Sequence, residues 1–197
     1  MNITFNKKKL EGFIELLPEV FEDDRGFLTR IYDERIFKDA GLPTVWSEES
    51  HHHTRRKHIL RGLYVQRPPF SEGKLLRVIR GEMLWVSVDV RTSSPMFGQW
   101  DSLVLSADRK NVLYTARGFA HGCVSLTDGV DLLIRSDNYF SAEHGLGILW
   151  NDPKLAIDWG LGEAAPYISE RDASYPSFQE FLKTYTKDIL SGNQPTI

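Results

Sequence analysis

The sequence predicts an all-β fold, a barrel or jelly roll made of short strands that each bury one face. Apolar and polar residues alternate with a period of two in several segments, which is the pattern of a strand with one side in the core. Gly, Pro, Asp and Ser separate these segments at even spacing, as in barrels and jelly rolls. With 197 residues, of which 41% are hydrophobic, the chain can bury one substantial core. We therefore expect one domain over residues 1–190 and a disordered tail over residues 191–197.

The expected elements begin with a short helix over residues 34–40, where the spacing of apolar residues is helical. The clearest strand pair is a hairpin, with strands at Lys74–Arg80 and 83–90 and a turn at Gly81 and Glu82. Alternation predicts further strands over 99–105, 111–115, 122–126 and 130–136. A last helix is expected over 177–190, because an apolar face repeats there at helical spacing through Phe178, Phe181, Leu182 and Tyr185.

Composition excludes several classes of function. The formal net charge of −3, from 24 Lys and Arg against 27 Asp and Glu, provides no field that would hold nucleic acid. Cys123 is the single cysteine, so an internal disulfide is excluded, and the first residues lack the apolar core of a signal peptide. No run approaches the ~20 apolar residues that cross a bilayer. We expect a cytoplasmic protein that partners neither membranes nor nucleic acid.

Short sequence blocks carry a family resemblance, and they occur in one order along residues 10–176. The most distinctive are Val-Phe-Glu-Asp-Asp-Arg-Gly-Phe at 20–27, Leu-Arg-Gly-Leu at 60–63, Lys-Leu-Leu-Arg-Val at 74–78 and Gly-Phe-Ala-His-Gly at 118–122. Many blocks in one order are a specific signal, and the chain resembles dTDP-4-dehydrorhamnose 3,5-epimerases. The resemblance implies a cupin double-stranded β-helix, or jelly roll, with short flanking helices. It also implies a homodimer with exchanged strands and a barrel pocket for a nucleotide-diphosphate sugar, with no cofactor.

The family reaction needs three kinds of side chain around a C4 ketone. A base removes the neighbouring proton, a cation holds the enolate oxygen, and an acid returns a proton to the opposite face. In the family these are a histidine paired with an aspartate, a lysine and a tyrosine, and the matching positions here are Tyr64, Asp172, Lys74 and Ile134. Lys74 and Asp172 fit the pattern, whereas Tyr64 and Ile134 depart from it. A phenol has an ordinary pKa near ~10, and isoleucine has no exchangeable proton.

Histidines elsewhere are candidates for the missing imidazole, and those close in sequence are His51, His52, His53 and His58. If the segment around residues 47–58 is a strand, Glu49, His51 and His53 point the same way. His121 is the other candidate, because imidazole exchanges protons near neutral pH. The alternative is that these are surface histidines and a hydrogen-bonded barrel histidine. The predicted catalytic set is Lys74, Tyr64, Asp172 and His121.

We predict a pocket without a metal. Cupins often bind a metal through a His-x-His pair, a glutamate seven residues before a glycine and a later histidine. Lys74 stands at that glutamate position before Gly81, and a protonated lysine has no lone pair to offer a metal. His51 and His53 with His121 remain possible ligands, but the pair precedes the usual strand.

The resemblance also assigns substrate-binding positions. Arg25, Arg61 and Lys74 match positions that hold the phosphates or the sugar, and a guanidinium can bind two phosphate oxygens at once. Phe27 matches the aromatic residue that stacks on the base. Arg30 stands where the family tends to have a glutamate, which leaves the nucleobase open between dTDP, GDP and CDP. The predicted substrate-binding residues are Arg25, Phe27, Arg30, Glu49, His51, Arg61, Tyr139 and Trp159.

Two functions from different classes agree with these residues. The first is an isomerase that epimerises C3, C5 or both in a nucleotide-linked 4-keto-6-deoxy or related sugar through an enolate, as in polysaccharide and O-antigen biosynthesis. The second is a catalytically degenerate member that binds a sugar nucleotide or a partner enzyme of the pathway. Retained Lys74 and Asp172 favour the enzyme, and the pair Tyr64 and Ile134 favours the degenerate member.

Overall fold

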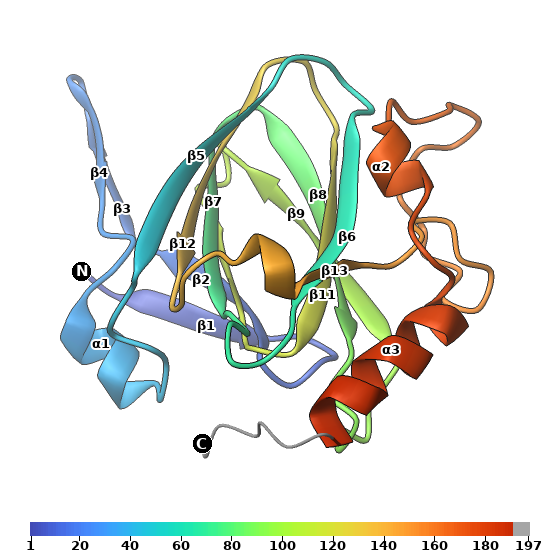
Figure 1. Cartoon of the computed structure of the whole chain (residues 1–197). Coiled ribbons are helices and arrows are strands. Elements are labelled where there is room, and N and C mark those ends of the chain that lie inside the picture. Colours follow the sequence, from blue (N-terminus) through green and yellow to red (C-terminus); the bar gives the residue numbers. More distant parts are fainter. Residues whose placement is uncertain (191–197) are drawn as a thin grey trace.

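Two antiparallel β-sheets face each other in the computed structural model of the chain, which describes the backbone of residues 1–190 and the side chains of residues 1–185 (Figure 1). The first sheet has six strands in the order β1 (Ile3–Lys7), β2 (Phe13–Pro18), β10 (Val112–Thr115), β7 (Lys74–Arg80), β12 (Val130–Ser136) and β5 (Glu48–Thr54). The second has five in the order β13 (Gly145–Gly147), β6 (Leu60–Gln66), β11 (Phe119–Ser125), β8 (Glu82–Asp89) and β9 (Trp100–Ser106). This is the predicted jelly roll.

A third, two-stranded sheet lies apart from the barrel. It is a hairpin of β3 (Val20–Asp23) and β4 (Gly26–Thr29) that projects outward beside the first sheet (Figure 1). The helices are α1 (Glu34–Asp39), the 3-10 turn η1 (Ala142–His144), α2 (Glu170–Ala173) and α3 (Phe178–Leu190). None of the helices within residues 1–190 is both long and apolar enough to cross a membrane.

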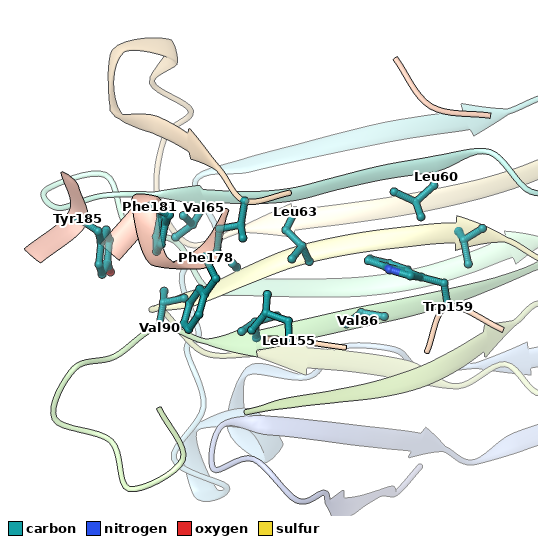
Figure 2. Packing of buried hydrophobic residues seen from close by; sticks show 14 of the residues in the cluster. Leu60, Leu63, Val65, Val86, Val90, Leu155, Trp159, Phe178, Phe181 and Tyr185 are labelled. Atoms are coloured by element: carbon teal, nitrogen blue, oxygen red, sulfur yellow. The ribbon is translucent and has the colours of Figure 1, made fainter. Parts of the chain in front are cut away.

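The second sheet is buried on both faces, which explains why β8 is buried almost throughout. Its inner side chains, such as Met83 and Trp85, meet residues of the first sheet inside the barrel. Its outer side chains pack under the C-terminal segment, where Phe178, Phe181 and Tyr185 form one face of α3 (Figure 2). The aromatic rings of this face stack in sequence, with centroids 6.3 Å and 5.0 Å apart. The helical face predicted from spacing is therefore confirmed.

The predicted hairpin at 74–90 is wrong. The strands β7 and β8 follow each other directly, but they belong to different sheets and pair with other neighbours. Gly81 joins them with φ of +72°, and a Cβ there would come within 2.5 Å of Thr127 Oγ1. The chain thus turns the corner of the jelly roll at Gly81, because each strand finds its partner far away in sequence.

Other predictions agree with the structure to within a few residues. Strand 130–136 has the predicted bounds, and the helix predicted at 34–40 ends one residue earlier, at Asp39. The strand predicted at 122–126 begins earlier, at Phe119. The tail predicted at 191–197 lies outside the described residues.

Candidate active site

A cavity of about 450 Å³ lies between the two sheets. The first sheet contributes side chains from β5, β7 and β12, and the second contributes them from β6, β8 and β11. Segments around η1 and α2 close the rim. The lining residues are His52, Arg61, Tyr64, Val65, Gln66, Glu72, Lys74, Trp85, His121, Gly122, Cys123, Ile134, Phe140, Ala142, Gly145, Leu146, Arg171 and Tyr175.

A break in β6 brings Arg61 and Tyr64 to the same cavity, although residues three apart in a regular strand face opposite sides. The register between β6 and β11 shifts at this point. Gly62 permits the break, since its φ is +110° and a Cβ there would lie 2.5 Å from the carbonyl oxygen of His121. Leu60, before the break, and Leu63, after it, both pack in the outer core.

Tyr64 is held by a buried carboxylate. Its hydroxyl donates a hydrogen bond of 2.6 Å to Oδ2 of Asp172, which is 2% exposed and belongs to α2. Burial raises the pKa of Tyr64, and the Asp172 carboxylate raises that pKa further. The guanidinium carbon of Arg171 lies 5.6 Å from the centre of the Tyr64 ring. At neutral pH the phenol keeps its proton, so Tyr64 is a proton donor in this site and not a base.

His121 is paired with Tyr64 across β11 and β6, so the two side chains are neighbours on the wall formed by the second sheet. Burial lowers the pKa of His121 well below its ordinary value, and the charge of Lys74 lowers it further. Its Nδ1 lies 3.2 Å from the hydroxyl of Ser87. Its Nε2 is buried and has no hydrogen-bond partner among the described residues. The ring is therefore neutral, with one nitrogen left to meet a ligand.

Lys74 lies on the opposite wall, formed by the first sheet. Its ammonium makes an ion pair of 2.6 Å with Oε1 of Glu72, and these side chains are only 15% and 12% exposed. Ile134 occupies the neighbouring strand, where it pairs with Leu76. Among the side chains that line the cavity, those next to Lys74 on this wall are thus one carboxylate and one apolar side chain, while Thr115 and Ser136 pair with Lys74 from the flanking strands.

Arg61 adds a positive charge to the cavity, and His52 adds a neutral imidazole. Burial lowers the pKa of His52 to about 4, with a further contribution from the charge of Arg61, so His52 is neutral at pH 7. The Nε of Arg61 is buried and lacks a hydrogen-bond partner within the described part of the chain. A buried guanidinium with an unused donor is suited to an anionic ligand.

Three predicted substrate-binding residues lie on or next to the projecting hairpin and outside this cavity. The side chain of Arg25 is 89% exposed and pairs with Asp23 at 2.5 Å. Phe27 is half-exposed, with the ammonium of Lys110 4.6 Å from its ring centre. Arg30 follows β4 and lies 3.5 Å from Asp33. These residues do not meet the cavity of their own chain.

Glu49 and His51 also lie outside the cavity, although β5 is the predicted strand and places both on one face. That face points away from the barrel, where His51 and His53 each approach Oδ1 of Asp131, at 2.9 Å and 2.7 Å. The same face of β5 carries Glu49, which pairs with Arg135. The imidazole that this strand presents to the cavity is His52, the residue between them.

Of the other two predicted substrate-binding residues, Tyr139 is exposed and Trp159 is buried. Tyr139 is 60% exposed beside Phe140, which lines the cavity mouth. Trp159 is 4% exposed within the outer core, and its Nε1 donates to the carbonyl of Trp150 (Figure 2). Since Trp159 packs behind Gly122 and does not line the cavity, its prediction as a substrate contact is corrected to a role in the core.

Sequence reasoning did not find Glu72, Arg171 or Tyr175, and it named His52 only as one of several histidine candidates. Glu72 could have been found from the sequence, because it stands two residues before Lys74 and an extended chain places such residues on the same side. Arg171 lies in α2 and Tyr175 follows it, and this helix is too short for its periodicity to be recognised. Their distance in sequence from β6 gave no sign that they meet Tyr64.

Two other predictions concern a metal site and the cysteine. Among the described residues, no three His, Cys, Asp or Glu side chains form a group that could hold a metal ion. Cys123 is buried, and burial raises the pKa of its thiol to about 12. Such a thiol stays protonated and is a poor nucleophile.

Comparison with known proteins places this geometry in a family. Residues 7–180 match the family model of dTDP-4-dehydrorhamnose 3,5-epimerase. The dTDP-4-dehydrorhamnose 3,5-epimerase of Pseudomonas aeruginosa is 41% identical over 164 residues, which are 83% of this chain and 89% of the relative.

Two solved structures agree with the present fold. The epimerase of Bacillus anthracis, with TDP and PPi bound, has a TM-score of 0.86 at 33% identity, covering 90% of this chain and 100% of the other. The epimerase RmlC of Legionella pneumophila, in complex with dTDP-4-keto-L-rhamnose, has a TM-score of 0.85 at 30% identity, covering 90% and 94%. The chain belongs to the dTDP-4-dehydrorhamnose 3,5-epimerase family of cupin carbohydrate epimerases.

Proposed function

We propose that this protein is a nucleotide-sugar epimerase that acts on a dTDP-linked 4-keto-6-deoxy sugar through an enolate. The observation that carries the proposal is the position of Lys74, whose ammonium lies in a cavity with proton-exchanging side chains on both walls. Family membership supports the same reaction, and one relative was solved with dTDP-4-keto-L-rhamnose.

The chemistry follows from the ketone. A proton next to a carbonyl is removed only if the negative charge that develops on oxygen is stabilised, and the ammonium of a largely buried lysine does this well. Lys74 has three N–H donors, so it can keep its bond to Glu72 and still donate to the ketone oxygen. The neutral Nε2 of His121 and the phenol of Tyr64 offer further hydrogen bonds to sugar hydroxyls.

Arg61 is proposed to hold the diphosphate. Its guanidinium lines the cavity and its Nε has no partner among described residues, so a phosphate oxygen would satisfy it. Tyr139 and Phe140, exposed at the mouth, offer flat faces for the base. These contacts place the nucleotide at the rim and the sugar between the walls.

We further propose that the active form is a homodimer in which the β3–β4 hairpin completes the site of the partner. The hairpin exposes a patch of apolar side chains that a second copy would cover, made by Val20, Phe21, Phe27 and Leu28. Arg25 and Phe27 would then reach a diphosphate and a base in the neighbouring chain, because they cannot reach the cavity of their own.

Subunit complementation tests the shared site. Lys74→Met and Arg25→Ala chains are mixed after each is shown to have low activity alone. A mixed dimer would have one site with both defects and one with none, so roughly a quarter of wild-type activity should return. Activity that stays at the sum of the two separate variants would contradict the exchange of hairpins.

One observation favours a second function, binding without turnover. Position 134 offers no proton, and Tyr64 is tied to Asp172 with a raised pKa. Proton NMR of dTDP-4-keto-6-deoxy-D-glucose with the protein in deuterated water separates the two functions. Loss of the C3 or C5 proton signal establishes the epimerase, whereas binding shifts without any loss of signal would leave a binding protein.

A further inference from the structure

We propose that Glu72 is the base and Tyr64 the acid of this enzyme, acting from opposite walls of the cavity. This inference rests on the proposed function. It reverses the direction of proton transfer implied by the family resemblance, in which the residue at position 64 removes the proton and a residue at position 134 returns it. The reversal accounts for both departures of this sequence at once.

Inversion of a carbon requires one proton-transfer group on each face of the sugar. The wall formed by the second sheet carries Tyr64 and His121, which are neighbours on paired strands. The wall formed by the first sheet carries Lys74 and Ile134 on the paired strands β7 and β12. Since Ile134 has no exchangeable proton, the first wall needs another group, and the carboxylate in contact with Lys74 is Glu72.

His52 is the other titratable side chain of the first wall, but it lies too far along the sheet. It is paired with Leu132, while Lys74 is paired with Ser136. Four residues along β12 correspond to about 13 Å. The carbon that loses its proton is bonded to the carbonyl carbon whose oxygen Lys74 would hold, so the base must lie close to Lys74. Glu72 meets this requirement with its Oε1 at 2.6 Å from the Lys74 ammonium.

The protonation state of Tyr64 is that of an acid. Its hydroxyl donates to Asp172, and both burial and that carboxylate raise its pKa, so the phenol is protonated when the sugar binds. Arg171 lies over the ring, with its guanidinium carbon 5.6 Å from the centroid, and its charge would compensate the phenolate that forms. A carboxylate on the other wall is ready to accept a proton without prior activation.

The reaction has two proton-transfer steps, one at each face of the carbon. Glu72 takes the proton from the carbon next to the ketone, the C–H electrons form the C=C bond, and the carbonyl oxygen becomes an enolate oxygen held by Lys74. The C=O bond then re-forms as the carbon takes the hydroxyl proton of Tyr64 at its opposite face. Glu72 is left as a carboxylic acid and Tyr64 as a phenolate, and transfer of one proton between them through water restores the site.

Two substitutions separate the steps, because loss of the C–H proton and inversion are measured independently by NMR in deuterated water. Glu72→Gln keeps an oxygen for Lys74 but removes the base, so exchange and inversion should both fall by ~10²–10³-fold. Tyr64→Phe leaves the base, which can return a deuteron to the same face. This variant should keep exchange within a few-fold of wild type and lose inversion. Glu143→Gln, an exposed glutamate of η1 outside the cavity lining, is the matched control and should behave as wild type.

A rescue experiment distinguishes a base from a residue that only positions Lys74. In Glu72→Ala, acetate and fluoroacetate have similar size and different basicity. If Glu72 is the base, acetate should restore more exchange than fluoroacetate at equal carboxylate concentration. Equal rescue by both would assign Glu72 to positioning and overturn the proposal, as would exchange that persists in Glu72→Gln or disappears in Tyr64→Phe. Wild-type protein that binds dTDP without any exchange would overturn the proposed function and this assignment with it.

Discussion

The hydroxyl of Tyr64 donates a 2.6 Å hydrogen bond to Asp172, a carboxylate that is 98% removed from solvent. Asp172 belongs to the four-residue helix α2, so this bond ties a barrel strand to the C-terminal segment across more than a hundred residues. Hydrogen bonds to a buried charge are stronger than neutral ones, and they become costly when one partner is removed. The bond therefore has a structural role as well as a place in the site.

Tyr64→Phe should lower the free energy of unfolding by about 1.5–3 kcal/mol, because the buried Asp172 carboxylate loses its short hydrogen bond. Tyr175→Phe is the control, since its ring packs 6.1 Å from that of Tyr64, whereas the hydrogen bond to Asp172 comes from the Tyr64 hydroxyl. That control should change stability by less than ~0.5 kcal/mol. Urea unfolding of both variants measures the difference, and equal stability of the two would contradict a strong Tyr64–Asp172 bond.

Lys74→Met should reduce turnover by ~10²–10³-fold while the affinity for dTDP stays within a few-fold, because the charge on the enolate oxygen forms only during the reaction. Methionine keeps the length and volume of the side chain and removes the cation. Lys154→Met, at an exposed site where the ammonium meets Gln179, is the control. Steady-state kinetics and dTDP titration check the prediction, and unchanged turnover would exclude the enolate mechanism.

The fold could be predicted from the sequence, but the pairing of its strands could not. Alternation locates β7 and β8, and a short glycine turn between two alternating segments favours a hairpin. Instead, β7 pairs with β10 and β12, and β8 pairs with β9 and β11. The strand pairing is determined by which side chains are buried between the two sheets and on the outer face of the second sheet. A short stretch of sequence does not contain this information.

Only part of the candidate site could be predicted from the sequence, because the remaining residues depend on contacts between distant segments. Lys74, Tyr64 and His121 line one cavity, and Tyr64 is bonded to Asp172, while their catalytic roles stay a prediction. Simple alternation would separate Arg61 from Tyr64, and only the break at Gly62 brings both inside. Arg25 and Phe27 lie outside the cavity of their own chain, and under the proposed exchange of hairpins the surface that receives them belongs to a second copy, which a single sequence does not reveal.

Stability should decrease as the pH falls from about 6.5 to about 4, because His52 has a pKa near 6.5 in an unfolded chain and about 4 in the folded one. Above this window His52 is neutral in both states; within it the unfolded state binds the proton first and is favoured. At ~1.4 kcal/mol per pKa unit the limit is about 3 kcal/mol, and partial solvent access reduces this to about 1–2 kcal/mol.

Replacement of the imidazole isolates this contribution from those of other groups. His52→Gln should flatten the curve of melting temperature against pH between about 6.5 and 4, with little change at pH 8. A parallel pair of curves for wild type and variant would show that His52 titrates normally in the folded protein.

The family arrangement can be rebuilt in this cavity, and doing so should remove the need for Glu72. Tyr64→His would place an imidazole beside the buried Asp172, and Ile134→Tyr would put a phenol on the opposite wall. In this double variant a base and an acid stand at the positions implied by the family, so inversion at C3 or C5 should rise by ~10-fold or more over Tyr64→His alone. Adding Glu72→Gln to the double variant should then lower exchange only a few-fold, against ~10²–10³-fold in the wild-type background. The effects are not additive, because Tyr64→His and Glu72→Gln both change the base that removes the C–H proton. A triple variant as inactive as Glu72→Gln itself would mean that Glu72 serves the cavity in another way, by holding Lys74 in place for either arrangement.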